Sequence, residues 1–351
     1  MLVILHGIPA YGAVEHYVAA IVDGLRGGDE EVVLVYPDAP ELAPFADLAG
    51  GNVRVVTFPV SDLSGPAPRL AVRLTRLLRD LHPRVVHVTE VWPTAQIAAR
   101  LARVPRVLVT HHTPELPRRD GAFGRLWLRL GWLTRPEVIY TSESDRATDG
   151  RSLRAHVVSL GIDLERFAAP RPALVRSGPI VGNVARLAVQ KGHRVLVDAA
   201  PRVLARHPHV SFVIAGDGEL RGELEQQLKE AGLGDRFELL GARDDIPELL
   251  ASFDVFAFPS FFEGLCVAVI EAQAVGVPVV ATGVGGLVET VVPGETGVRC
   301  EPGDAFSLAD GINWVLDHPD QAAVLAAEAK RRVYERFSAQ RMVDETLQLY
   351  R

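Results

Sequence analysis

Short apolar runs alternate with longer helical patterns along the whole chain. The runs predicted as strands in the first half are Leu2–Leu5, Val32–Tyr36, Val53–Phe58, Val85–Val88, Arg106–Thr110, Val138–Thr141 and His156–Val158. Those in the second half are Ile180–Asn183, Ser211–Ala215, Phe237–Leu240, Val255–Phe258, Val279–Thr282 and Gly297–Cys300. Runs rich in Val, Ile and Leu with helices between them are typical of parallel sheets covered by helices on both faces. We therefore predict an α/β fold in which a doubly wound sheet occurs twice.

Two prolines mark the boundary between the halves. Segment 161–172 follows the last strand of the first half, and Pro170 and Pro172 block regular structure in it. We predict a first domain over residues 1–168 and a second domain over residues 173–337. The remaining segment, 338–351, begins with Ser338 as a helix cap and carries apolar residues at helical spacing.

Composition limits the class of protein further. The 351 residues suffice for two domains of ordinary size, and 48% of them are hydrophobic. The net charge of −7 gives no basic surface for DNA or RNA, so nucleic acid is excluded as a partner. No secretion signal and no apolar run of about eighteen residues is visible. Cys266 and Cys300 lack metal-ligand spacing and fit a reducing compartment, so we expect a cytoplasmic protein.

The stretch 259–282 carries two glutamates at a strand–loop–helix junction. Glu263 lies in the loop after a strand, and Glu271 lies within a helix predicted from about Leu265 to Val275. Eight helical residues rise by about 12 Å and return close to the same face of the helix. One extended ligand can therefore meet both carboxylates. Two solvated glutamates on an ordinary amphipathic helix are the alternative reading of this spacing.

A sugar joined through a diphosphate to a ribose has a length that suits this junction. Glu263 would accept hydrogen bonds from sugar hydroxyls, and Glu271 would accept two from the ribose diol. The N–H groups at the predicted helix start, at Leu265 and Cys266 after Gly264, would bind a phosphate. The junction therefore favours a nucleoside-diphosphate sugar as the ligand.

Two cations follow the first strand of the second half. Arg186 lies at the end of that strand, and Lys191 lies at the start of the next helical pattern. Both can reach a diphosphate, Arg186 through its planar fork and Lys191 as a compact charge. No Asp-x-Asp occurs in the chain, so no carboxylate pair is evident for a divalent ion. We therefore expect the two cations and the helix start to neutralise the leaving diphosphate without a metal.

These stretches resemble the motifs of the retaining glycosyltransferases of family 4. Residues 263–271 match the family's Glu-x7-Glu signature, residues 186–192 match its Arg-Leu-x-x-x-Lys-Gly pattern, and residues 285–289 match its Gly-Gly-x-x-Glu element. The resemblance implies the GT-B fold, in which two Rossmann-like doubly wound domains face a central cleft that holds the ligands. It also implies that the terminal helix, 338–351, crosses back onto the first domain.

The resemblance implies further binding residues. Gly216 lies in a Gly-Asp-Gly turn, where glycine lets the backbone approach the ligand or a neighbouring strand. The loop that carries Arg243 would contact the base of the nucleotide. Gly12 lies where relatives carry Gly-Gly-x-Glu and would offer backbone N–H groups to the phosphate or sugar. Here Ala13 replaces the second glycine, and its methyl group narrows the approach.

A histidine at the end of the fifth strand is the candidate neighbour of the transferred sugar. The resemblance assigns this place to His112, with His111 as the second choice. The expected role is to orient the sugar and to stabilise charge, without acting as a general base. A satisfied polar residue at a strand end is the alternative.

Residues 118–135 are apolar and basic by turns. Such a segment can rest on an anionic membrane or bind a lipid-linked or acidic acceptor. The alternative, which we favour, is a helix whose Phe123, Leu126, Trp127 and Leu130 pack on the first sheet. Peripheral association with a membrane stays open.

The sequence predicts a glycosyltransferase that moves a hexose-type sugar from a nucleoside-diphosphate sugar to an acceptor hydroxyl. The predicted catalytic residues are His112, Arg186, Lys191 and Glu263. The resemblance implies retention at the anomeric carbon, and no carboxylate is evident that would attack this carbon, so we expect departure and attack on the same face. The donor is the only nucleotide partner expected, with uridine preferred over guanosine. The acceptor is a small molecule, a glycan or a lipid-linked molecule.

Two other functions are compatible with the same residues. A nucleotide-sugar epimerase with hydrolytic steps would release free sugar or a new epimer without any acceptor. A catalytically silent scaffold would bind the nucleotide and transfer nothing.

Overall fold

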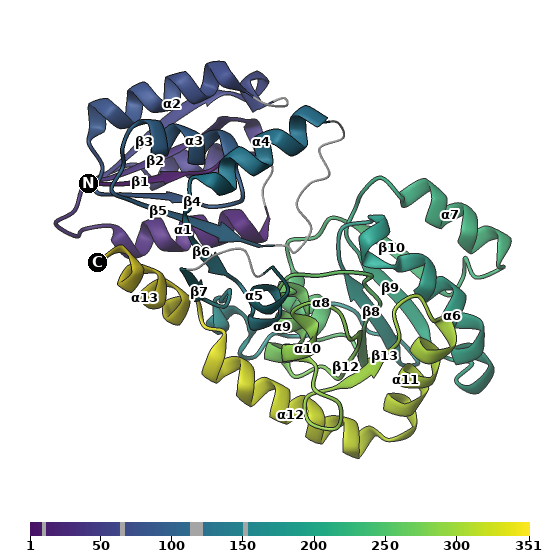
Figure 1. Ribbon diagram of the computed structural model, residues 1–351. Helices are drawn as coiled ribbons and strands as arrows, with labels where there is room; N and C mark the ends of the chain where they lie inside the picture. The colour runs from purple at the N-terminus through teal and green to yellow at the C-terminus, as the bar shows by residue number, and fades with distance from the viewer. Residues whose placement is uncertain (9–11, 64–66, 113–121, 150–153) are drawn as a thin grey trace. The chain divides into compact units, whose positions relative to one another are not determined.

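The computed structural model describes residues 1–8, 12–63, 67–112, 122–149 and 154–351. The chain forms two compact units (Figure 1). Unit 1 consists of Met1–Leu160 together with Ala339–Arg351, and unit 2 consists of Gly161–Ser338. Each unit has its own parallel sheet and its own hydrophobic core.

Unit 1 is built on a seven-stranded parallel sheet in the order β3-β2-β1-β4-β5-β6-β7. Its strands are β1 (Leu2–Leu5), β2 (Val32–Asp38), β3 (Val53–Pro59), β4 (Val85–Val88), β5 (Arg106–His111), β6 (Glu137–Tyr140) and β7 (Ala155–Val157). All residues of β1 and β4 are buried, as expected for central strands that are covered on both faces. The strand order reverses between these two strands, which makes their carboxyl ends the switch point of unit 1.

Helices cover the sheet of unit 1. They are α1 (Ala13–Leu25), α2 (Pro68–Leu81), α3 (Pro93–Leu101), α4 (Ala122–Leu133), α5 (Glu143–Asp149) and α13 (Ala339–Tyr350), with 3-10 helices η1 (Pro40–Leu48) and η2 (Val60–Leu63). Helix α2 shows the local cause: Leu70, Leu74 and Leu78 recur every four residues and are all buried. Pro68 suits its first turn, where the missing N–H costs nothing.

Unit 2 is built on a six-stranded parallel sheet in the order β10-β9-β8-β11-β12-β13. Its strands are β8 (Ile180–Val184), β9 (Ser211–Ala215), β10 (Phe237–Gly241), β11 (Val255–Phe258), β12 (Val279–Thr282) and β13 (Val298–Cys300). Its helices are α6 (His193–Arg206), α7 (Arg221–Glu230), α8 (Ile246–Leu250), α9 (Val267–Val275), α10 (Leu287–Thr290), α11 (Ala305–Asp317) and α12 (Pro319–Arg336), with η3 (Leu164–Phe167) and η4 (Val189–Lys191). The order reverses between β8 and β11, so their carboxyl ends form the switch point of unit 2.

The predicted α/β class with two doubly wound parallel sheets is confirmed. Every strand predicted from an apolar run is present, and its ends differ from the prediction by at most two residues. The apolar runs were sufficient because parallel strands buried on both faces need continuous Val, Ile and Leu.

Helix α13 is joined to unit 1 by a buried chain of hydrogen bonds. The His87 ring on β4 contacts the Tyr350 hydroxyl at 2.6 Å and the Thr110 hydroxyl at 2.7 Å. Thr110 in turn lies 3.1 Å from the Tyr17 hydroxyl on α1, which also bonds Thr346 of α13. All five side chains are buried, and burial lowers the pKa of His87 to about 3. The neutral ring therefore has one donor and one acceptor, and both are used.

Replacing Tyr350 by phenylalanine is expected to destabilise unit 1 by about 1–3 kcal/mol, because one buried nitrogen of His87 loses its partner. Urea unfolding measures the change. Tyr334→Phe is the matched control. That hydroxyl belongs to an exposed side chain, and among the described residues it donates one hydrogen bond, to the Leu164 carbonyl oxygen at 3.3 Å. An equal, small effect of both substitutions would contradict the proposed importance of the buried chain.

Candidate active site

The switch point of unit 2 collects the candidate residues. The loop after β8 carries Arg186 and Lys191, and the loop after β11 carries Glu263. Because β8 and β11 are neighbouring parallel strands, both loops leave the same edge of the sheet side by side. The loop after β12, with Gly285 and Gly286, joins them on the next strand.

Lys191 and Glu263 form an ion pair at this edge. The Lys191 Nζ lies 2.6 Å from Glu263 Oε1, and the side chains are only 19% and 7% exposed. The same carboxylate oxygen accepts a 2.5 Å hydrogen bond from Ser260, and the Lys191 ammonium lies 5.3 Å from the centre of the Phe258 ring. An ammonium group has three donors, so Lys191 can hold Glu263 and still donate to a phosphate. The sequence placed both residues in the site but did not predict their pairing, nor the part of Ser260.

Glycines let the three loops pack backbone against backbone. Gly285 has φ +49, and a Cβ there would lie 1.8 Å from the Glu263 carbonyl oxygen. A Cβ at Gly286 would lie 2.7 Å from the Gly264 carbonyl oxygen, which accepts a hydrogen bond from the Gly286 N–H. The Gly-Gly element therefore supports the main chain that carries Glu263.

Replacing Gly285 by alanine is expected to destabilise unit 2 severely, by about 3 kcal/mol or more, because left-handed backbone strain adds to a clash with main chain. Gly294→Ala is the matched control: its φ is +74, and a Cβ there would meet nothing within 4 Å. The control should cost only about 1 kcal/mol. The difference in thermal stability between the two variants measures the contribution of the clash, because Gly294→Ala introduces backbone strain without a clash.

Helix α9 begins later than predicted. It starts at Val267, with Cys266 in the capping position, whereas the sequence pattern predicted a start at Leu265. The reason is tertiary: the Gly264 carbonyl oxygen, which would otherwise accept a hydrogen bond from an N–H of the helix, accepts one from the Gly286 N–H. The N–H groups that have no carbonyl partner within the helix therefore begin at Cys266, and Leu265 is not one of the residues that opens the helix.

Glu271 lies in α9 with a carboxylate that is mostly shielded from water. Burial raises its pKa to about 7, against a smaller lowering by the nearby charge of Arg166. Within the described residues no group donates a hydrogen bond to it. A carboxylate in this state has unused acceptor capacity, and a pair of hydroxyl donors would stabilise its ionised form.

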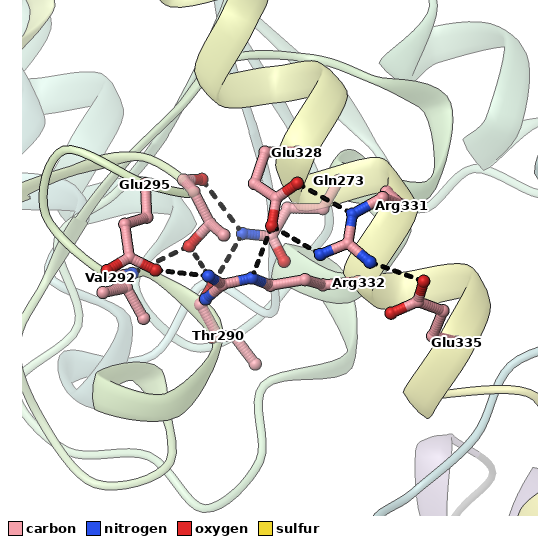
Figure 2. Close-up of polar contacts among 9 residues, drawn as sticks. Gln273, Thr290, Val292, Glu295, Glu328, Arg331, Arg332 and Glu335 are labelled. Carbon is pink, nitrogen blue, oxygen red and sulfur yellow. Dashed lines mark hydrogen bonds and ion pairs between the residues drawn. The ribbon is translucent and has the colours of Figure 1, made fainter.

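A polar network holds the far side of α9 in place (Figure 2). The Gln273 side chain donates a 2.8 Å hydrogen bond to the Thr290 carbonyl oxygen. The loop after Thr290 is tied to α12, because Arg332 contacts Glu295 and also donates to Glu328 at 2.9 Å. Glu328 is shared with Arg331, which Figure 2 shows on the same helix. The helix that presents Glu271 is thus fixed by buried and surface contacts together.

Arg186 and Gly216 have different surroundings from Lys191. The Arg186 side chain is 65% exposed and lies 3.7 Å from Glu219. It is therefore free to turn toward an anion. Gly216 has φ +137, and a Cβ there would lie 1.9 Å from the Ala185 carbonyl oxygen. Its N–H donates to Gly241, so the structure explains this glycine by contact with a neighbouring strand.

Arg243 lies after β10, two strands away from the switch point. Its guanidinium is engaged by both oxygens of Asp245, at 2.8 and 2.6 Å. The Arg243 side chain is therefore already paired with Asp245, so a nucleotide base would contact the main chain of this loop.

His112 follows β5 in unit 1 and is held by one hydrogen bond. Its Nε2 lies 2.8 Å from the Thr89 carbonyl oxygen, so this nitrogen carries the proton. Its Nδ1 is buried and has no hydrogen-bond partner within the described residues. Burial lowers the pKa of His112 to about 4, so the ring is neutral at physiological pH and Nδ1 is an acceptor. His111 is fully buried against the Tyr140 ring, which favours His112 of the two.

A charged cluster at the switch point of unit 1 was not predicted. His6, after β1, lies 3.2 Å from Glu15 of α1 and 3.5 Å from Glu90, after β4. Burial alone would lower the pKa of His6, but the two carboxylates outweigh it and raise the pKa to about 9. The signal was present in the sequence, since polar residues directly follow two strands that become neighbours. Nearby Gly12 has an extended backbone, and Ala13 opens α1.

Helix α4 departs from the packing that the sequence suggested. Leu126 and Leu130 are 50% and 37% exposed, so the prediction that they pack on the first sheet is wrong. The helix instead packs on α3 through its opposite face, where the Trp127 indole contacts Thr94 at 3.2 Å. Gly131 lets the two helices approach closely. The side chain of Phe123 and residues 118–121 lie outside the described part of the chain.

The described residues contain neither a cluster of metal-binding side chains nor a membrane-spanning helix. No three His, Cys, Asp or Glu side chains there are grouped so that they could hold a metal ion. No helix among them is long and apolar enough to cross a membrane.

Comparison with known proteins identifies the family. Residues 168–332 match the model described as glycosyl transferases group 1, and residues 13–166 match that of glycosyltransferase family 4. A glycogen synthase of Mycobacterium tuberculosis is 34% identical over 80% of this chain and 72% of its own length. The chain belongs to glycosyltransferase family 4. A GDP-mannose-dependent α-(1-6)-phosphatidylinositol monomannoside mannosyltransferase of the same species is 30% identical over 93% of this chain and 91% of its own.

Solved structures agree with this assignment at the level of the fold. Anabaena HepE, crystallised with UDP and glucose, superposes with a TM-score of 0.83 over 99% of this chain and 98% of its own, at 24% identity. Sucrose-phosphate synthase of Thermosynechococcus elongatus gives a TM-score of 0.81 over 100% and 98%, at 23% identity. The predicted GT-B fold is confirmed, and so is the prediction of an enzyme that transfers a sugar from a nucleotide-sugar donor.

Proposed function

We propose that this family 4 glycosyltransferase moves a hexose from a nucleoside-diphosphate hexose to an acceptor hydroxyl with retention at the anomeric carbon. The observation that carries the proposal is the arrangement at the switch point of unit 2. The Lys191–Glu263 pair lies in front of the start of α9. Glu271 lies further along the same helix, and its carboxylate is shielded from water and has no hydrogen-bond donor among the described residues.

Each group has a role in holding the donor. Glu271 accepts two hydrogen bonds from the ribose diol, which its unused acceptor capacity suits. The start of α9, from Cys266 onward, binds the diphosphate through backbone N–H groups. Lys191 and the exposed Arg186 supply the positive charge. Glu263 fixes the Lys191 ammonium and faces the sugar hydroxyls.

The reaction proposed for this site needs no enzyme nucleophile. The bond between the anomeric carbon and the diphosphate oxygen breaks, and its electron pair goes to that oxygen. The acceptor oxygen forms the new bond on the same face, and its proton goes to the leaving phosphate oxygen. Lys191 and Arg186 stabilise the negative charge that develops on this oxygen, as a bound metal ion does in other transferases. His112, neutral with a free Nδ1, accepts a hydrogen bond from a sugar hydroxyl and so orients the sugar.

Uridine is the proposed base. HepE, with nearly the same chain length and fold, was crystallised with UDP and with UDP-glucose. The GDP-mannose-dependent mannosyltransferase supports guanosine as the second choice.

A thermal-shift panel of UDP, GDP and ADP, with and without EDTA, tests base and metal requirement together. UDP at about a hundredfold excess over its Kd is expected to raise the midpoint by on the order of 5 °C, equally with chelator present. UDP-hexose should then be consumed only when an acceptor is added. Release of free sugar or of an epimer without acceptor would show that the protein is an epimerase or hydrolase and not a transferase. Binding of UDP without turnover on a broad acceptor panel would indicate a catalytically silent scaffold.

A further inference from the structure

Helix α4 of unit 1 carries a stripe of leucines that are exposed on one face of the helix. Leu126, Leu130 and Leu133 are 50%, 37% and 72% exposed. At about 100° per residue these three positions fall within an arc of roughly 60° on one face of the helix. Single exposed leucines are common on proteins, but three on one stripe form a continuous surface.

Basic side chains border this stripe on one side. Arg125 and Arg129 are exposed and lie on the arc next to the leucines. Arg135 is exposed just beyond the end of the helix. Within the described residues none of these three guanidinium groups has an ion-pair or hydrogen-bond partner. In contrast, Arg331 on α12 is held by two glutamates.

The opposite face of α4 already has a partner. Trp127 bonds to α3, and a Cβ at Gly131 would lie 2.4 Å from the Gln96 side chain. Figure 1 shows α4 lying beside α3. The helix is therefore anchored to unit 1 by one face while the leucines and arginines point away from it. No acidic residue occurs in α4.

We infer that this face of α4 docks on the surface of an anionic lipid bilayer. The leucines enter the boundary between headgroups and acyl chains, and the arginines beside them contact lipid phosphates. Amphipathic helices that lie in the membrane interface use apolar and basic side chains in this way. Charge complementarity selects this occupant, since the three guanidinium groups lack partners among the described residues, in a chain whose net charge is −7. The inference concerns unit 1 alone and does not depend on the proposed reaction.

Vesicle flotation of the full chain tests the inference. The chain is expected to bind vesicles with about one third phosphatidylglycerol in phosphatidylcholine and to bind pure phosphatidylcholine weakly, with binding reduced at about 0.5 M salt. Arg125→Gln with Arg129→Gln should lower the partition coefficient on the order of 30-fold. Leu126→Ser with Leu133→Ser should lower it at least about tenfold.

The matched control lies on the neighbouring helix. Arg100 and Leu101 of α3 are also exposed, so Arg100→Gln with Leu101→Ser removes the same kinds of side chain from another surface and should leave binding unchanged. Unchanged thermal midpoints show that the variants fold. Absence of binding to the anionic vesicles, or equal binding by all variants, would overturn the inference. A lipid-independent dimer that only the leucine variant loses, without vesicle binding, would assign this face to a second copy and overturn it too.

Discussion

Replacing Lys191 by methionine is expected to lower kcat by about two to three orders of magnitude. The ammonium is a partly buried cation at the switch point of unit 2, and it lies beside the start of α9 where the diphosphate is proposed to bind. Charge that develops on a leaving phosphate in a shielded site is worth several kcal/mol to stabilise. Steady-state kinetics with UDP-hexose and a transfer acceptor measure the loss.

The same substitution also removes the partner of Glu263, so stability must be separated from catalysis. Methionine at 191 leaves a 7% exposed carboxylate whose one remaining hydrogen-bond donor among the described residues is Ser260, at a cost of about 3 kcal/mol. Adding Glu263→Gln removes that uncompensated charge. The double variant is therefore expected to regain most of the lost stability. Because Glu263 is itself proposed to contact the sugar, the reference for turnover is the single Glu263→Gln variant, and the kcat of the double variant should still be about two to three orders of magnitude lower.

Lys229→Met provides the control for loss of a lysine in unit 2. Lys229 is exposed at the end of α7, far along the chain from both switch-point loops. Its replacement should change neither kcat nor unfolding. A double variant that turns over substrate as fast as the single Glu263→Gln variant would show that Lys191 only supports the fold, and the proposed role at the phosphate would fail.

The strands could be predicted because their cause is local. Leu2–Leu5 and Val255–Phe258 are buried on both faces, so each is a short continuous apolar run. A helix with one buried face would instead show apolar residues at every third or fourth position. The candidate residues Lys191 and Glu263 could be found for the same reason. Each lies in the loop that follows such a strand, and the carboxyl ends of parallel strands share one edge.

The remainder depends on contacts between distant parts of the chain. The start of α9 is set by the bond between Gly264 and Gly286, which no local pattern encodes. The His6 cluster requires that β1 and β4 become neighbours. Helix α4 has enough apolar residues to bury either face, and the close approach of Gly131 to α3 decides which face is exposed. Hydrophobic periodicity finds an apolar face but does not say whether a partner covers it.

Replacing Glu271 by glutamine is expected to stabilise the free protein at pH 8. Burial raises the pKa of Glu271 to about 7, above the ordinary value of 4.5, so between these values the folded protein binds more protons than the unfolded chain. Stability therefore falls as pH rises through this window, and the full cost of the ionised carboxylate is present above about pH 7. The variant should gain about 1–3 kcal/mol at pH 8 and nothing near pH 4. Thermal unfolding at the two pH values measures this. Glu31→Gln is the control: Glu31 is exposed and its side chain has no partner among the described residues, so the substitution should leave stability unchanged at both pH values.

The same substitution is expected to weaken UDP binding by one to two orders of magnitude at pH 8, because an amide cannot accept both hydrogen bonds of a ribose diol as a carboxylate does. For the unmodified protein, the Kd should rise as pH falls below about 7, approaching tenfold per pH unit while Glu271 is protonated. The phosphate of UDP titrates near pH 6 in either case, so the difference between the two proteins in calorimetric titrations isolates Glu271. A stabilised variant that binds UDP as tightly as before, with the same pH profile, would mean that the shielded carboxylate does not meet the ribose. If the Glu271→Gln variant is more stable and binds UDP more weakly, then Glu271 is a group whose burial costs stability in the free protein and serves binding of the ligand.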